Sequence, residues 1–117
     1  MWLFTQFGFY SIVRKQDGIH VRGRVRKDLE NLKAAAKLEG EILDWRKPKP
    51  GGYKADYPYR IILTDNTDLR RIMCLLADIL DYPNFKGHIE ADPIQRERDE
   101  AYFKVWDVMR RALGNDT

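Results

Sequence analysis

The sequence has little of the chemistry that marks an enzyme or an exported protein. It contains one cysteine and two histidines in 117 residues, so an intrachain disulfide is excluded and few soft metal ligands are present. Cys74 lies inside an apolar run, where we expect a buried and unreactive thiol. No stretch approaches the ~20 apolar residues that span a bilayer, and the first residues lack the basic start of a signal peptide. We therefore expect a cytoplasmic protein without a membrane partner.

Catalytic and nucleotide-binding motifs are also missing. The chain has no Walker loop, dinucleotide fingerprint or Gly-x-Ser-x-Gly elbow, and no ribonucleoprotein octapeptide or Gly-x-x-Gly loop. His88, Glu90 and Asp92 alternate and would share one side of an extended segment, but Asp92 is better explained as a helix N-cap before Pro93. We predict no catalytic residue, metal site or cofactor. The sequence leaves enzymatic activity open and favours a non-enzymatic protein.

Positive charge is concentrated in the first half of the chain. The formal net charge is +3, but residues 1–60 hold 13 Lys or Arg against 7 Asp or Glu, whereas residues 61–117 hold 8 against 11. With 44% hydrophobic and 33% charged residues, the chain has enough apolar residues for the core of one domain. The basic half predicts either a surface for an acidic partner or an ordinary solvated face.

Residues 9–26 predict a β-hairpin. Asp17 and Gly18 stand between two apolar-rich runs, and an Asp-Gly pair supplies the positive φ angles of a two-residue type I′ turn. This turn places Gln16 opposite Ile19 and divides the side chains between two faces. The predicted core face holds Tyr10, Ile12, Ile19, Val21 and Val25. The opposite face holds Phe9, Val13, Lys15, His20, Arg22, Arg24 and Arg26.

The remaining segments complete an α+β domain. Residues 2–6 predict an interior strand, continuous with the hairpin through a bulge or a close backbone approach at Gly8. Two further strands, 41–45 and 57–64, flank a basic Pro- and Gly-rich loop. In the second of these strands, one face holds Arg60 and Ile62 and the other holds Tyr57, Tyr59, Ile61 and Leu63.

Three helices are predicted from caps and apolar spacing. They run from Asp28 to Gly40, from Asn66 or Thr67 to Tyr82, and from Asp92 to Gly114. The order ββαββαα predicts a single α+β domain over residues 1–117. We expect a four-stranded, mainly antiparallel sheet with helices on one face, ferredoxin-like or a split sandwich.

Several short motifs carry a resemblance to other proteins. They are Trp2-Leu3-Phe4-Thr5, Phe7-Gly8-Phe9, Asp56-Tyr57-Pro58-Tyr59-Arg60, Tyr82-Pro83-Asn84-Phe85-Lys86 and Val105-Trp106. With these motifs the chain resembles a group of short uncharacterised bacterial proteins that share a Trp-Leu-Phe-Thr first strand, an Asp-Tyr-x-Tyr-Arg strand, a Tyr-x-Asn-Phe-Lys turn and a late Val-Trp. The resemblance implies a bacterial or phage origin, and it implies no activity and no site residues.

The arginine-bearing face is the candidate binding surface. Arg22, Arg24 and Arg26 alternate along one strand, and the predicted register sets Phe9 among them. Sheets that bind nucleic acid hold phosphates with guanidinium groups and stack unpaired bases on aromatic rings. The predicted contact residues also include Arg60 and three lysines of the basic loop, Lys47, Lys49 and Lys54.

Three interpretations of this face stay open at the level of the sequence. The first is a solvated surface whose charge keeps sheets from associating. The second, and the leading functional hypothesis, is a small binding protein whose basic, aromatic face contacts an acidic partner such as DNA or RNA. The third is a protein–protein interaction module, such as an inhibitor or adaptor encoded by a phage or mobile element. The sequence indicates neither the partner's identity nor the oligomeric state.

Overall fold

The computed structural model describes residues 1–46, 56–80, 87–89 and 91–114. Contacts divide the chain into two compact units, Met1–Leu80 and Asp81–Thr117. Each unit is described by itself, and one domain over residues 1–117 stays a prediction.

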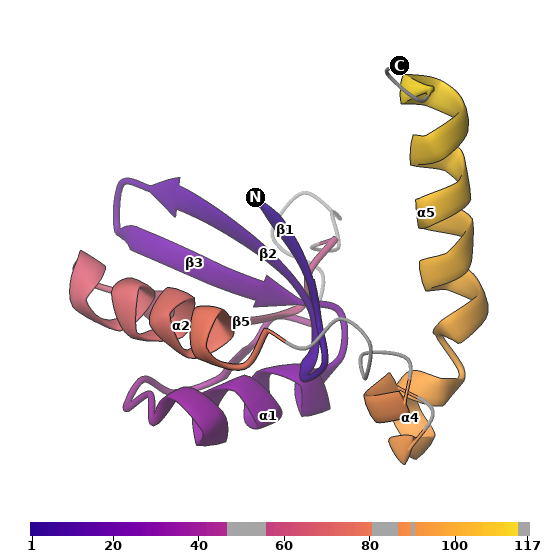
Figure 1. Ribbon diagram of the computed structural model, residues 1–117. Coiled ribbons are helices and arrows are strands. Elements are labelled where there is room, and N and C mark those ends of the chain that lie inside the picture. The colour runs from indigo at the N-terminus through magenta and orange to yellow at the C-terminus, as the bar shows by residue number, and fades with distance from the viewer. Residues whose placement is uncertain (47–55, 81–86, 90, 115–117) are drawn as a thin grey trace. The chain divides into compact units, whose positions relative to one another are not determined.

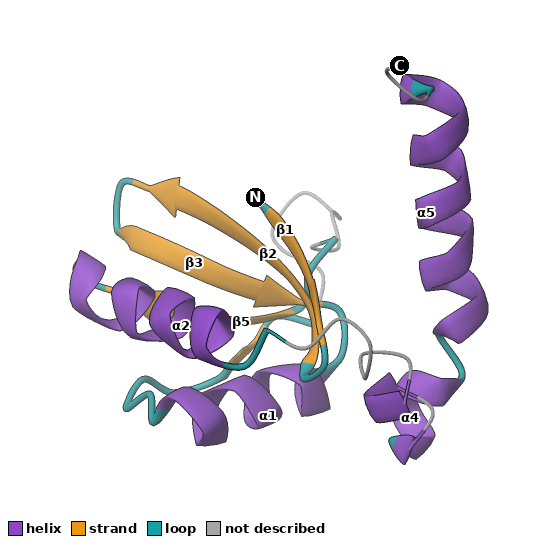
Figure 2. Ribbon diagram, in the orientation of Figure 1, coloured by secondary structure: helices purple, strands orange, loops and turns teal. Residues whose placement is uncertain are grey.

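The first unit is an antiparallel sheet with helices on one face (Figure 1). In chain order it consists of β1 (Trp2–Thr5), β2 (Gly8–Lys15), β3 (Gly18–Gly23), α1 (Arg26–Ala36), β4 (Leu43–Asp44), β5 (Tyr59–Leu63) and α2 (Asn66–Asp78). The strands lie in the order β1-β2-β3-β5-β4, and every neighbouring pair is antiparallel. Figure 2 shows α1 and α2 along the same side of these strands.

The predicted α+β class is confirmed, and the predicted four strands are wrong. The described residues form a sheet of five strands, because the first predicted strand is two strands joined by a turn. The observed order of the first unit, βββαββα, also differs from the βαββαβ order of a ferredoxin-like unit. That finer description of the fold is therefore not confirmed.

Gly8 ends the tight turn that separates β1 from β2. Its φ of 153° is accessible to glycine and strained for other residues. Thr5 lies opposite Gly8, and its hydroxyl donates to the Gly8 carbonyl oxygen at 3.0 Å and accepts from the Phe7 amide at 3.1 Å. Residues 2–15 are therefore two strands rather than one kinked strand, and β1 lies at the edge of the sheet rather than in its interior.

The predicted hairpin forms, but its turn lies one residue earlier. Lys15 lies opposite Gly18, so Gln16 and Asp17 form the turn. Among these four residues only Gly18 has a positive φ, at 136°, so the predicted type I′ turn is wrong. A neighbour from outside the hairpin requires glycine at this position, because a Cβ there would lie 2.4 Å from the Leu63 carbonyl oxygen.

The register of the hairpin differs from the predicted one by two residues. Val13 lies opposite His20 rather than Arg22, and Ser11 lies opposite Arg22. Because side chains alternate with a period of two, an even shift leaves each of them on its predicted face. The division into a core face and an opposite face is therefore confirmed within β2 and β3.

The hydrophobic core lies between the sheet and its two helices. It comprises Tyr10, Ile12, Ile19, Val21, Leu29, Leu32, Ala36, Leu38, Ile61, Leu63 and Ile72. Burying one large apolar side chain contributes about 1.5–3 kcal/mol. In α2 the buried residue is Ile72, whereas Cys74 is exposed, so the predicted buried thiol is wrong.

Both ends of α1 differ from the prediction. The helix begins at Arg26 without a side-chain cap, and it ends with Lys37 in the left-handed conformation, at a φ of 54°, rather than at Gly40. Asp28, the predicted cap, lies buried in the first turn, where its carboxylate accepts a hydrogen bond from the Phe9 amide at 3.2 Å. Asp28 therefore ties the helix to β2.

The other predicted elements of the first unit form close to their expected positions. β4 and β5 lie within the predicted strands, and Arg60 and Ile62 lie on the face opposite the core, as predicted. The cap of α2 is Asp65 rather than Asn66 or Thr67, because its side chain accepts from the Thr67 amide at 2.8 Å.

The second unit is helical in most of its described residues. It contains α4 (Pro93–Arg96) and α5 (Asp99–Leu113), and residues 87–89 are also helical. The predicted single last helix is therefore interrupted between α4 and α5. α5 ends at Gly114 as predicted, with the Gly114 amide donating to the Arg110 carbonyl oxygen at 3.0 Å. Among the helices of the described ranges, none is long and apolar enough to cross a membrane.

Replacing Gly8 with alanine should destabilise the first unit. The φ of 153° strains an L residue, and a Cβ at this position would lie 2.3 Å from the Asp28 carboxyl carbon. We expect the free energy of unfolding to fall by at least about 1 kcal/mol, the cost of a sparsely populated backbone conformation. Urea denaturation followed by circular dichroism measures this change.

Gly23→Ala is the matched control for this substitution. Its added Cβ meets nothing closer than the Leu29 Cγ at 3.4 Å, and Gly23 has no positive φ. We expect this variant to stay within about 0.5 kcal/mol of the wild type. Equal stability of the two variants would contradict the role given to Gly8.

Candidate functional site

The sheet face opposite α1 and α2, called the outer face below, carries the predicted arginines. Directly opposed residues of an antiparallel pair share a face, so strand pairing sets a row of side chains across the sheet. From β1 to β4 this row consists of Trp2, Ser11, Arg22, Arg60 and Leu43. Two arginines therefore lie side by side on β3 and β5.

Tyr57, just before β5, holds two arginine side chains against its ring. The guanidinium carbons of Arg22 and Arg24 each lie 4.6 Å from the ring centroid, within cation–π range. Arg22 Nη2 also donates to Ser11 Oγ at 2.7 Å, and Arg24 Nη1 donates to the Asp56 carbonyl oxygen at 3.2 Å. The ring was predicted to share the core face of β5, and it instead contacts the arginines of the outer face.

Arg60 is a cation held by neutral groups. The residue is 4% exposed, its Nη1 donates to His20 Nδ1 at 3.1 Å, and its Nη2 donates to the Tyr57 carbonyl oxygen at 3.0 Å. The Trp45 ring centroid lies 4.1 Å from the guanidinium carbon. Burial lowers the pKa of Arg60 and the charge of Arg22 lowers it further, whereas the charge of Asp17 acts in the opposite direction. The side chain therefore carries a desolvated positive charge next to a second one.

No carboxylate forms an ion pair with Arg22, Arg24 or Arg60 within the described residues. The Nε atoms of Arg22 and Arg60 are buried and have no hydrogen-bond partner there. Buried charge is costly unless it is paired or hydrogen-bonded. The outer face therefore holds positive charge outside any ion pair of the described residues, and Arg24 exposes part of this charge to solvent.

His20 connects Arg60 to the turn of the hairpin. The histidine is 2% exposed, and its Nε2 lies 2.7 Å from Asp17 Oδ1. A guanidinium group can only donate, so Nδ1 accepts from Arg60 and the ring hydrogen on Nε2 is donated to Asp17. This hydrogen bond lowers the pKa of the Asp17 carboxyl. The hydrogen bonds from Asp17 through His20 therefore help to orient Arg60 from the hairpin turn.

Aromatic rings occupy the β1 end of the outer face. Phe4 stacks on Phe9 with ring centroids 4.7 Å apart, and Trp2 meets Phe9 edge-on at 6.4 Å. Phe9 in turn lies 6.3 Å from the Tyr57 ring. Trp2 is 68% exposed and Phe4 is 39% exposed. A series of rings therefore connects the edge strand with the arginines.

Part of the predicted contact set is brought together on this face. The residues that meet there are Phe9, Arg22, Arg24 and Arg60. Arg26 does not join them, because α1 begins at this residue and removes it from the strand. Lys47, Lys49 and Lys54 lie outside the described residues.

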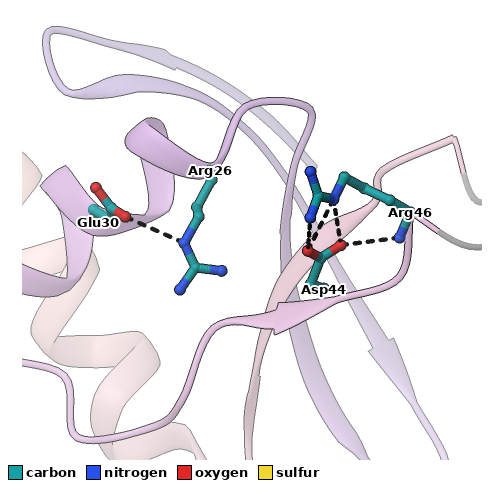
Figure 3. Close-up of polar contacts among 4 residues, drawn as sticks. All are labelled: Arg26, Glu30, Asp44 and Arg46. Atoms are coloured by element: carbon teal, nitrogen blue, oxygen red, sulfur yellow. Dashed lines mark hydrogen bonds and ion pairs between the residues drawn. The ribbon is translucent and has the colours of Figure 1, made fainter.

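Two other arginines of the first unit are neutralised by carboxylates (Figure 3). Arg26 Nε donates to Glu30 Oε1 at 3.2 Å along the surface of α1. Arg46 Nη2 lies 2.7 Å from Asp44 Oδ2, and hydrogen bonding from Arg46 lowers the pKa of the Asp44 carboxyl. Arg26 and Arg46 thus differ from Arg22, Arg24 and Arg60, which form no ion pair within the described residues.

Of the aromatic residues around the arginines, Phe9 was predicted as part of the site, whereas Trp2, Phe4, Trp45 and Tyr57 were not. Trp2 and Phe4 alternate with Leu3 and Thr5, a period that assigns both rings to one face of a strand. The signal was obscured because both faces of this short strand carry apolar residues. No sequence pattern indicates the role of Trp45. Its ring reaches the buried guanidinium of Arg60 because β4 pairs with β5.

His88 does not lie in the extended segment that would align it with Glu90 and Asp92 around a metal ion. Residues 87–89, which include His88, are helical, and Glu90 lies outside the described residues. In the parts of the chain that are described, no group of three or more His, Cys, Asp or Glu side chains is placed to hold a metal ion.

Comparison of the chain with models of protein families, with curated proteins and with solved structures gives no match in any of the three. The resemblance to short bacterial proteins therefore stays a prediction. The outer face is interpreted from its own chemistry.

Removing the charge of Asp17 should make the free energy of unfolding depend less on pH in the acid range. The hydrogen bond from His20 lowers the folded-state pKa of Asp17 below the ordinary value of 3.8. A lowered carboxyl pKa stabilises the native state above the unfolded-state pKa, and this contribution is lost as pH falls through the folded-state pKa. Asp17→Asn keeps the acceptor oxygen without the charge, so it should be less stable than the wild type at about pH 6, with a difference that shrinks below about pH 4.

Urea titrations at a series of pH values measure this difference. The wild type is the reference at every pH, so the titration of the other carboxylates cancels in the comparison. A stability difference that stayed constant from about pH 6 to about pH 2.5 would contradict the interaction between Asp17 and His20.

Proposed function

We propose that this protein is a non-enzymatic binding protein that binds nucleic acid through the outer face of its sheet. The proposal is carried by the neighbouring pair Arg22 and Arg60, with which no carboxylate forms an ion pair within the described residues. The fork of donors on a guanidinium group matches the oxygens of a phosphate. Arg24, exposed beside the Tyr57 ring, supplies a further positive charge.

The arrangement of charge favours an anionic ligand. Cross-strand charge pairs change the stability of a sheet by roughly 0.2–1 kcal/mol, and directly opposed like charges lower it. Burial of Arg60 adds to the cost, as the direction of its pKa shift indicates. A phosphodiester over this face would offset the repulsion, because it carries the opposite charge and can accept hydrogen bonds from Arg22 and from the exposed Arg24. The charges that weaken the free protein thus strengthen its complex.

A protein partner is the second candidate. The exposed rings of Trp2 and Phe4 favour it, because aromatic residues are enriched in protein interfaces. A contact of this kind, as in an inhibitor or adaptor encoded by a phage or mobile element, would depend on burial of the rings and would survive high salt. Nucleic-acid binding weakens steeply with salt, so salt dependence separates the two candidates.

Removing one arginine from the outer face should reduce the salt dependence of nucleic-acid binding. For Arg22→Gln and for Arg24→Gln, we expect the slope of log affinity against log salt to become shallower by about 0.7–0.9, the contribution of one phosphate contact. Fluorescence anisotropy of labelled DNA and RNA, single-stranded and duplex, across a salt series measures these slopes.

Arg70→Gln is the matched control for the loss of one positive charge. Arg70 is exposed on α2, which packs on the opposite side of the sheet, so its removal should leave the slope unchanged. The nucleic-acid proposal would be overturned by absence of binding at low salt, or by equal effects of all three substitutions.

A further inference from the structure

The aromatic residues beside the arginines narrow the class of ligand. We infer that the outer face binds single-stranded nucleic acid, with unpaired bases stacked on the rings of β1 and phosphates held by Arg22 on β3 and by Arg24 just after it. This inference rests on the proposed function and makes it more specific. It is carried by the exposure of the rings, by their continuity with the guanidinium groups, and by their position on a sheet.

Two rings of β1 are accessible to a ligand and already oriented. Trp2 is 68% exposed and Phe4 is 39% exposed, on an edge strand. Phe4 is held by its stack on Phe9, with planes inclined by 22°, and Trp2 is held by its edge-on contact with the same ring. A ring whose orientation is fixed before binding loses little conformational freedom when a base stacks on it.

The rings and the guanidinium groups form a continuous strip across the sheet. Phe9 on β2 contacts the Tyr57 ring, and the same ring carries Arg22 and Arg24. β1 and β3 are separated by two strand spacings, about 10 Å. A nucleotide chain lying across the strands therefore meets stacking surfaces at the β1 end and phosphate ligands at the β3 end.

A duplex makes no use of these stacking surfaces. Its bases are paired and stacked on one another, so their edges and the phosphates are what a protein reaches. Reading those edges takes a helix or a two-stranded ribbon inserted in a groove, whereas the outer face presents the flat of a sheet. Unpaired bases expose their faces, and each stack on an aromatic side chain strengthens binding by about tenfold or more.

The test compares three labelled ligands at one low salt concentration. They are a single-stranded oligonucleotide of about 12 nucleotides, the same sequence in a duplex, and an abasic strand of equal length. The abasic strand keeps the phosphates and lacks the bases, so this comparison needs no variant of the protein. We expect the single strand to bind about tenfold or more tightly than either of the other two ligands.

Phe4→Leu removes one stacking ring and keeps an apolar side chain. It should weaken single-strand binding by about tenfold and leave duplex binding unchanged. Phe103→Leu is the matched control, because Phe103 is 59% exposed on α5 and is not part of the sheet. The control should bind as the wild type does, and circular dichroism establishes that both variants fold.

The outcomes separate this inference from the proposal on which it rests. Equal binding of the single strand, the duplex and the abasic strand would overturn the single-strand inference and leave nucleic-acid binding in place. No binding of any of them at low salt would overturn both. If Phe4→Leu failed to fold, the abasic strand would still decide between base stacking and phosphate contact alone.

Discussion

The pairing of β3 with β5 is the interaction on which the rest of the structure depends. It joins the meander of β1, β2 and β3 to the second pair of strands, and it sets both faces of the sheet at once. On the core side it places Val21 opposite Ile61, both fully buried. On the outer side the same register places Arg22 opposite Arg60. Burial of each apolar side chain contributes about 1.5–3 kcal/mol, more than the roughly 0.2–1 kcal/mol scale of a cross-strand charge pair, so the core keeps the two charges together.

Neutral partners allow the outer face to retain its charge. Arg60 is hydrogen-bonded by an imidazole and a carbonyl oxygen and covered by an indole, and none of these groups cancels its charge. Arg46, by contrast, is paired with Asp44 at the surface, and this ion pair removes charge locally. Because these groups bond Arg60 without cancelling its charge, a positive charge stays at the middle of the sheet. The proposed ligand class follows from this charge together with the neighbouring rings.

Two errors in the predicted fold, at Gly8 and at Gly18, share one physical origin. Gly8 was interpreted as a bulge and Gly18 as part of a type I′ turn, because a sequence shows a glycine without showing what approaches it. The neighbours are the Asp28 side chain and the Leu63 carbonyl oxygen, which come from 20 and 45 residues further along the chain. Both glycines are required by these long-range contacts. The predicted faces of the hairpin are correct although its register is wrong, because the register differs by an even number of residues.

The sequence by itself determined which side chains share a face of one strand. Arg22 and Arg24 were assigned together because alternation follows from the extended backbone and needs no knowledge of neighbours. Phe9 joined them through the predicted hairpin, whose register error of two residues leaves the faces unchanged. Only the tertiary structure decided that Arg60 lies beside Arg22, that Tyr57 holds two guanidinium groups, and that an aromatic edge strand adjoins them. The reason is the range of the forces involved. Alternation is a local property of the backbone, whereas strand order results from burying apolar surface between segments that are distant in the sequence.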